Sequence, residues 1–131
     1  MKSMTSPAQV VLIALLGLGI TGLAAAQTQQ DPRLAQLADN AGCTFPSVPS
    51  IPAAESATME QMVATQGAIQ SYIAASNELL DCLDGITKNT DLAEEDRQLA
   101  LDAYNAEVSN QETLAENWNV QRTRFLELQQ K

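Results

Sequence analysis

The fold is decided by residues 58–84, which read TMEQMVATQGAIQSYIAASNELLDCLD. Thr58 and Gln61 have the spacing of a capping box, in which two side chains satisfy each other's backbone N–H groups at a helix start. Behind them, positions alternate in steps of three and four, which is the period of one helix face. The stretch therefore predicts a long helix over about 59–84, ended by Asp84 and Gly85. Its predicted core row is Met59, Met62, Gln66, Ile69, Ile73, Ser76, Leu80 and Leu83.

A second helix is predicted over about residues 92–128, where neither glycine nor proline interrupts the chain. Asp91 and Glu94 are placed to open it, and acidic residues 94–96 complement the positive end of the helix dipole. Because the connection is short, we expect an all-α fold built on an antiparallel, coiled-coil-like two-helix hairpin. The second helix has the predicted core row Leu101, Tyr104, Val108, Gln111, Ala115, Trp118, Arg122 and Phe125.

The two predicted rows match layer by layer if the chain folds back symmetrically about residues 88–89. Ile69 then faces Val108, and the polar interruptions Gln66 and Gln111 coincide near the middle. The two amides either hydrogen-bond to each other in the core and fix the register, or lie on a partly wet edge.

Two segments precede the hairpin. We expect residues 27–42 to be a lead-in and a short helix, with Asp31 as N-cap, Pro32 at the first helical position and Gly42 just past the end. Residues 43–54 form a proline-rich segment with proline at every third position, the period of a polyproline II helix. Apolar residues share this period, so we expect the extended segment to dock on a helix along an edge of Phe45, Val48 and Ile51.

Cys43 and Cys82 are the only cysteines, and in an exported chain they are expected to form one intramolecular disulfide. A bridge between two copies and a pair of free thiols are the alternatives. An extended chain from Cys43 to Thr58 reaches about 46 Å, further than the roughly 35 Å of helix between Met59 and Cys82. The segment can therefore run back along the first helix. Gly67 either allows this close approach or is a tolerated weak position.

Residues 1–26 have the pattern of an export signal. Lys2 precedes an apolar run over 10–23, and Ala24 to Ala26 supply the small residues that signal peptidase needs. The alternative is an uncleaved signal that anchors the chain in the inner membrane, although the apolar core is shorter than the ~20 residues that span a bilayer. After cleavage we expect a periplasmic chain with no membrane insertion, whose residues 43–131 form one disulfide-stapled hairpin domain.

Composition limits the chemistry. The sequence has no histidine, and residues 27–131 carry 6 Lys and Arg against 16 Asp and Glu, a net charge of −10. This excludes histidine-based catalysis, and the acidity argues against a nucleic-acid partner. We predict no catalytic residue, cofactor or metal ligand. Acidic pairs such as Asp81 with Asp84, or Glu112 with Glu116, are expected to form a solvated face rather than a calcium or hydrolase site.

The candidate interaction site lies at the end of the second helix, because positions past residue 118 have no partner on the first helix in the symmetric hairpin. Tryptophan and arginine are enriched in interface hot spots. Fraying of this end, or packing on the start of the same chain, is the alternative. The predicted interaction residues are Trp118, Arg122, Phe125, Leu126 and Leu128.

The function predicted from these features is that of a small, non-enzymatic interaction or structural module of the cell envelope. Its partner would be an unidentified envelope protein or a second copy of the chain. A periplasmic holdase, whose helices clamp unfolded clients, is an alternative, and a carboxylate-dependent hydrolase is a further one.

Several short motifs resemble a family of small exported proteobacterial proteins of uncharacterised function. In that family a Cys- and Pro-rich start leads into a helix that ends at a second Cys. The resemblance covers roughly residues 43–125 and departs at residues 53–55, where the family has glycine. It implies the architecture above and carries no activity, substrate or cofactor. The matching motifs are the run Cys43–Pro52, Ala57–Thr58, Met62, Gln66, Tyr72, Asp81–Leu83, Tyr104–Glu107 and Trp118–Asn119.

Overall fold

The computed structural model describes residues 31–131, which contain three α-helices and no strand. The helices are α1 (Pro32–Ala41), α2 (Met59–Lys88) and α3 (Glu94–Gln129). The all-helical class predicted from the sequence is confirmed for this part of the chain. The export signal predicted over 1–26, and the lead-in up to residue 30, lie outside the described residues.

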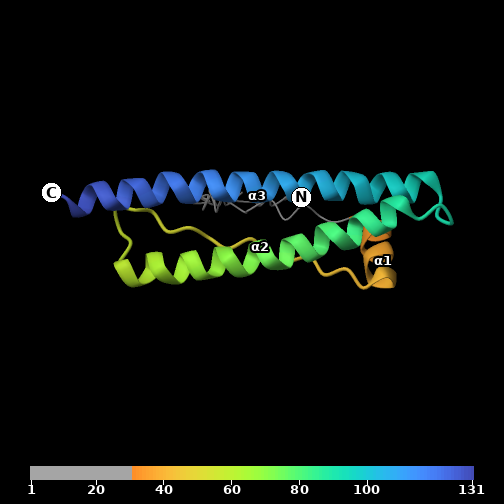
Figure 1. Ribbon diagram of the computed structural model, residues 1–131, viewed down its shortest axis with the longest axis horizontal. Helices are drawn as coiled ribbons and strands as arrows, with labels where there is room; N and C mark the ends of the chain where they lie inside the picture. Colours follow the sequence, from red (N-terminus) through yellow and green to blue (C-terminus); the bar gives the residue numbers. More distant parts are fainter. Residues whose placement is uncertain (1–30) are drawn as a thin grey trace, which may run out of the picture.

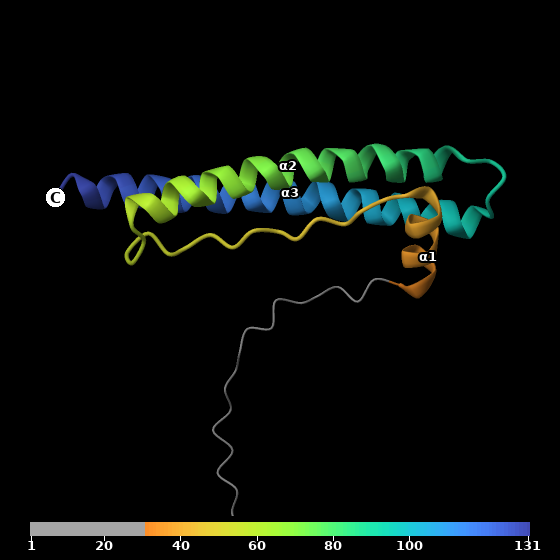
Figure 2. The same cartoon turned by 90° about the horizontal axis from the view of Figure 1, so that it is seen from below.

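The two long helices lie side by side and run in opposite directions, joined by residues 89–93 (Figure 1). With 30 and 36 residues, α2 and α3 are about 45 and 54 Å long at 1.5 Å per residue. α1 packs across the connected end of the pair, which we call the turn end (Figure 2). The other end, where α2 begins and α3 finishes, is called the open end. Among these three helices, none has the length and apolar character that a membrane crossing requires.

Local signals place α1 and the start of α2 where the sequence predicts them. The Asp31 carboxylate accepts a hydrogen bond from the Arg33 N–H at 2.8 Å, and Gly42 adopts φ 74° beyond the last turn of α1. At α2, Thr58 N–H donates to Gln61 Oε1 at 2.8 Å while Gln61 N–H donates to Thr58 Oγ1 at 3.1 Å. The predicted capping box is therefore confirmed.

The connection between α2 and α3 differs from the prediction. α2 continues through Gly85 to Lys88 instead of ending at Asp84 and Gly85, because Ile86 is 5% exposed and packs in the core. α3 begins at Glu94, and its N-cap residue makes no side-chain cap, so Asp91 does not open this helix as expected. The chain thus folds back around residue 91 rather than 88–89.

The disulfide between Cys43 and Cys82 is present, with the two Cα atoms 5.6 Å apart, which confirms the predicted pairing. From Cys43 the chain runs extended to the open end along one side of the helix pair (Figure 2). A turn follows in which the Ala57 N–H donates to the Ala53 carbonyl at 3.0 Å, so the chain reverses here without a glycine. Phe45 packs against the core, whereas Val48 stays 49% exposed.

The buried face of each long helix is rotated relative to the predicted row. Tyr72 and Leu79 are buried on α2 where residues 73 and 80 were expected, and Ala100 and Glu107 are buried on α3 in place of residues 101 and 108. The disulfide explains the direction of the rotation. Cys82 lies within one turn of residues 79 and 86, so it draws the proline-rich segment onto that flank, and the core forms where α3 and the segment both cover α2.

Two apolar clusters result, one at each end of the rod. The cluster at the turn end joins all three helices and the proline-rich segment through Ala38, Cys43, Leu79, Leu83, Ile86 and Ala100. The cluster at the open end joins Ala54, Met62 and Phe125, with Trp118 and Leu128 partly buried against them.

Candidate functional site

The structure separates the five predicted interaction residues into two groups. Phe125 is 3% exposed and packs against Met62 and Ala54, and Trp118 and Leu128 are partly buried around it. Arg122 and Leu126 are exposed. The expectation that α3 has no partner beyond residue 118 is therefore wrong. α2 and the residues before it reach Phe125 because the longer α2 and the later fold-back shift the pairing of the two helices.

A shallow groove runs between α2 and α3 at the open end, and we call it the open-end groove. Its floor contains the buried side chains of Met62 and Phe125, while its rim leaves Met59, Val63 and Leu126 exposed by 57%, 62% and 44%. Three exposed apolar side chains around one depression are unusual on a strongly acidic chain. The complete lining is Met59, Met62, Val63, Gln66, Trp118, Arg122, Phe125 and Leu126.

The turn before α2 is tied to the last turns of α3. The Ala54 N–H donates to Gln121 Oε1 at 3.0 Å, and Arg124 Nε donates to Glu55 Oε1 at 3.1 Å. The pKa of Glu55 is lowered by a hydrogen bond from its own backbone and by Arg124. These contacts occupy Arg124, whereas Arg122 lines the open-end groove and forms no ion pair within residues 31–131.

A buried polar cluster in the middle of the hairpin was not predicted. Glu107 Oε1 accepts hydrogen bonds from Tyr72 Oη and Ser76 Oγ, both at 2.5 Å, and Gln111 Nε2 donates to Ser76 Oγ at 2.7 Å. Burial and the neighbouring Glu107 carboxylate raise the pKa of Tyr72 well above its usual range. The exposed fractions of Tyr72, Ser76 and Glu107 are only 4%, 0% and 5%, so the cluster fixes helix register and leaves no room for a solute.

Gln66 and Gln111 do not pair. Gln111 bonds Ser76 and Asn77 across the hairpin, and Gln66 is exposed in the open-end groove. The sequence signal that could have revealed the true cluster is a glutamate four residues before Gln111, at a core spacing of the helix. Glutamate is almost never fully buried without partners, so this spacing alone does not predict a buried carboxylate.

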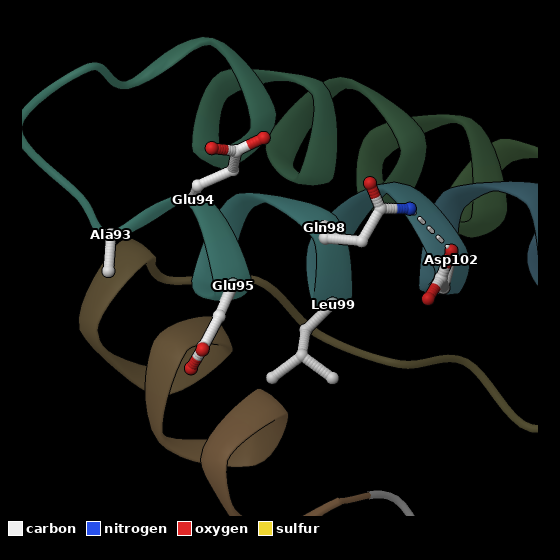
Figure 3. Close-up of a pocket in the computed structure, with 6 residues that line it drawn as sticks. All are labelled: Ala93, Glu94, Glu95, Gln98, Leu99 and Asp102. Atoms are coloured by element: carbon white, nitrogen blue, oxygen red, sulfur yellow. Dashed lines mark hydrogen bonds between the residues drawn. The ribbon is translucent and has the colours of Figure 1, made fainter.

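In the part of the chain that the structure describes, the acidic side chains do not gather into a metal site. Glu94, Glu95 and Asp102 line an open hollow on the first turns of α3, but the two glutamates point to different sides of the helix and Asp102 accepts a hydrogen bond from Gln98 (Figure 3). Within residues 31–131, no three acidic or cysteine side chains are grouped closely enough to hold a metal ion.

The two members of the predicted acidic pair on α2, Asp81 and Asp84, have different surroundings. Asp84 binds Lys88 at 2.6 Å one turn later, and this contact raises the pKa of Lys88. Asp81 and the pair Glu112 and Glu116 are exposed. Exposed pairs of this kind belong to a solvated helix face.

Comparisons with protein-family models, with curated proteins and with solved structures found no match. The resemblance to small exported proteobacterial proteins therefore stays a prediction from the sequence motifs.

Proposed function

We propose that this protein is a small, non-enzymatic protein-interaction module of the bacterial cell envelope. In this proposal the chain is exported, cleaved after Ala26, and functions in the periplasm as a coiled-coil-like hairpin with its proline-rich segment docked alongside. The disulfide supports export, because such bonds persist in oxidising compartments.

The observation that carries the proposal is the open-end groove. Met59, Val63 and Leu126 border this groove, and their apolar side chains remain exposed to solvent on an otherwise strongly acidic protein. Trp118 and Arg122 stand beside them, and these residue types are enriched where binding energy concentrates. The groove is shallow and open, as suits a protein surface better than a small molecule, which prefers an enclosed pocket.

Site-specific photo-crosslinking in the cells that produce the protein tests this function. A photoreactive residue replacing Leu126 or Val63 should give the same discrete adduct, because both positions border the groove. The control is Val120, which is 58% exposed on α3 but does not line the groove. Adducts from the control that equal those from the groove, or no adduct from Leu126 and Val63, would overturn the proposal.

Intact-mass measurement of the protein recovered from the periplasmic fraction tests the localisation. A mature chain that begins at Gln27 is expected. A full-length chain recovered with the inner membrane would show instead that the signal remains as an anchor.

A further inference from the structure

The rotation of the core leaves two mostly apolar rows outside it, each with one polar member. On α2 the row has one member every seven residues, and on α3 a second row has the same spacing. In paired helices, positions seven apart lie one above another along the rod. Each row therefore forms a stripe along most of its helix. The rows are Met59, Gln66, Ile73 and Leu80 on α2, and Leu101, Val108, Ala115 and Arg122 on α3.

Both rows belong to the same side of the hairpin. Met59 and Gln66 from one row border the open-end groove together with Arg122 from the other. Near the middle of the rod, Gln111 bonds Asn77 across the same side. The proline-rich segment occupies the opposite side, where it meets α2 through the disulfide and α3 through Gln121. We call the side with the two rows the uncovered face.

The uncovered face remains accessible in this structure. Met59 is 57% and Leu101 is 37% exposed, and Ile73, Leu80 and Val108 are only partly buried by their neighbours. The rim residues Val63 and Leu126 add to the same surface at the open end. A mostly apolar stripe along two neighbouring helices is the form taken by the inner face of a four-helix bundle before its second half is added.

We propose that a second copy of this chain covers the uncovered face, so that two hairpins pack antiparallel as a four-helix bundle. This inference rests on the proposed interaction function and names its partner. The first argument is the seven-residue spacing of the two rows. A surface of two antiparallel helices with this spacing matches another pair of helices with the same spacing, and a second hairpin supplies that pair with both rows in place.

The size of the face is the second argument. α2 has 30 residues, and two neighbouring helices each about 10 Å wide present a face of about 45 by 20 Å, or about 900 Å². A stable protein interface buries about 800 Å² on each partner. Overlap along the whole rod therefore reaches the area that a stable dimer needs, whereas contact at the open ends alone would not.

Charge selects the antiparallel orientation. The half of the hairpin at the turn end, residues 74–108, carries nine carboxylates and two cations, a net charge of −7. The other half, residues 55–73 and 109–131, carries five carboxylates and three cations, a net charge of −2. Parallel stacking would oppose the two acidic halves. Antiparallel stacking opposes an acidic half to the weakly charged one and brings Arg122, which has no ion pair within the described residues, toward the acidic half of the partner copy.

Sedimentation equilibrium of the purified, oxidised protein tests the proposal at concentrations up to about 100 µM, well above the Kd of a micromolar complex. We expect a dimer. The double variant Val63→Glu/Leu101→Glu should weaken the dimer at least about tenfold, because it places charges in both halves of the face. The matched control Val120→Glu adds the same charge at an exposed valine of α3 outside the face and should leave the dimer unchanged. Circular dichroism establishes that each variant is folded.

A wild-type protein that stays monomeric over this range would overturn the inference, and so would equal weakening by the control. The orientation has its own readout. A photoreactive residue at position 59 should attach to residues 80–101 of the second copy, and attachment to the second copy's open end would contradict the antiparallel arrangement. If the protein is a monomer in solution but position 126 still gives an adduct with another protein in cells, only the dimer is refuted. Failure of this inference is therefore distinguishable from failure of the proposed function.

Discussion

At the scale of single residues, Glu107 shows how a charged group determines the register of a helical hairpin. Its carboxylate receives hydroxyl donors from Tyr72 and Ser76, both on α2, and an amide from Asn110 at 3.3 Å. A buried polar group without partners costs about 1–3 kcal/mol. A sliding of α3 past α2 would remove both hydroxyls at once. The cluster therefore penalises alternative registers more than it adds to stability in the correct one.

The alkaline limb of the stability profile should depend on Tyr72. Its pKa is raised in the folded protein, so the folded chain holds the phenol proton at pH values where the unfolded chain, with an ordinary value near 10, has lost it. The contribution of Tyr72 to stability is therefore fully present below pH 10. Above pH 10 the free energy of unfolding falls, by up to about 1.4 kcal/mol per pH unit. Urea denaturation between pH 8 and 11.5 measures this fall.

The comparison of two variants isolates the contribution of Tyr72. Tyr72→Phe should be less stable than wild type at pH 8, because Glu107 loses a donor, but its stability should fall less steeply above pH 10. Tyr104→Phe retains Tyr72 and should keep the wild-type slope. Identical alkaline slopes in the two variants would be inconsistent with this role.

Gly67 illustrates a position with no special requirement. It lies inside α2, and a Cβ built on it meets no atom within 4 Å, so it does not admit the proline-rich segment to a close approach. Gly67→Ala should therefore raise the free energy of unfolding by about 0.5–1 kcal/mol, measured by urea denaturation. Gly85→Ala is an independent second example, since its Cβ also meets open space. Destabilisation by either alanine would mean that the backbone there needs glycine.

At the scale of elements, the ends of the helices follow local signals where a side-chain cap exists and tertiary contacts where it does not. α2 begins at a complete capping box, while α3 begins after Ala93 without a side-chain cap. α2 likewise passes through Gly85 because the core holds Ile86. Sequence patterns placed the start of α2 correctly, but they placed the end of α2 four residues too early and the start of α3 about two residues too early.

Removal of the cap on α2 should have a measurable cost. Thr58→Ala leaves the Gln61 N–H without its acceptor and should lower the free energy of unfolding by about 1 kcal/mol, as determined by urea or thermal denaturation. Thr113→Ala, at an exposed site inside α3, is the matched control and should change stability little. Equal effects of the two substitutions would show that the loss arises from the threonine side chain in general and not from the cap.

At the scale of the whole molecule, a closed loop holds the rod together. The proline-rich segment is fastened at the turn end by the disulfide. At the open end it is held by the hydrogen bond from the Ala54 N–H to Gln121, and the next residue, Glu55, accepts a hydrogen bond from Arg124. Between these points Val48 is half exposed, so apolar contact alone covers the segment incompletely. The covalent link is therefore needed to keep the segment on its face of the hairpin.

Loss of the disulfide should destabilise the whole domain. Cys43→Ser/Cys82→Ser opens a loop whose ends are 39 positions apart, and the chain-entropy model gives a loss of about 4 kcal/mol. Urea denaturation of the oxidised and reduced wild type and of the double variant measures it. Glu55→Gln, which removes only the exposed ion pair with Arg124, should have a much smaller effect. Unchanged stability after complete reduction would show that packing alone retains the segment.

Features that depend on nearby residues, or that leave a single choice, could be predicted from the sequence. These are the all-helical class, the caps of α1 and α2, and the pairing of Cys43 with Cys82, for which only one intramolecular partner exists. The candidate site could be predicted only in part. Arg122 and Leu126 are exposed as expected, but Phe125 is buried by Met62, which no local signal places opposite it.

The positions of the helices and the pairing of the two sulfurs follow from the sequence, because helix caps and hydrophobic period act over a few residues and two cysteines leave a single intramolecular choice. Which flank of each helix became the core depended on long-range packing. Alternating steps of three and four describe two overlapping rows equally well, and the choice between residues 73 and 72 depends on what covers the helix from outside. Here the disulfide draws a third layer onto one flank, burying Tyr72 and Leu79 and leaving the other row at the surface.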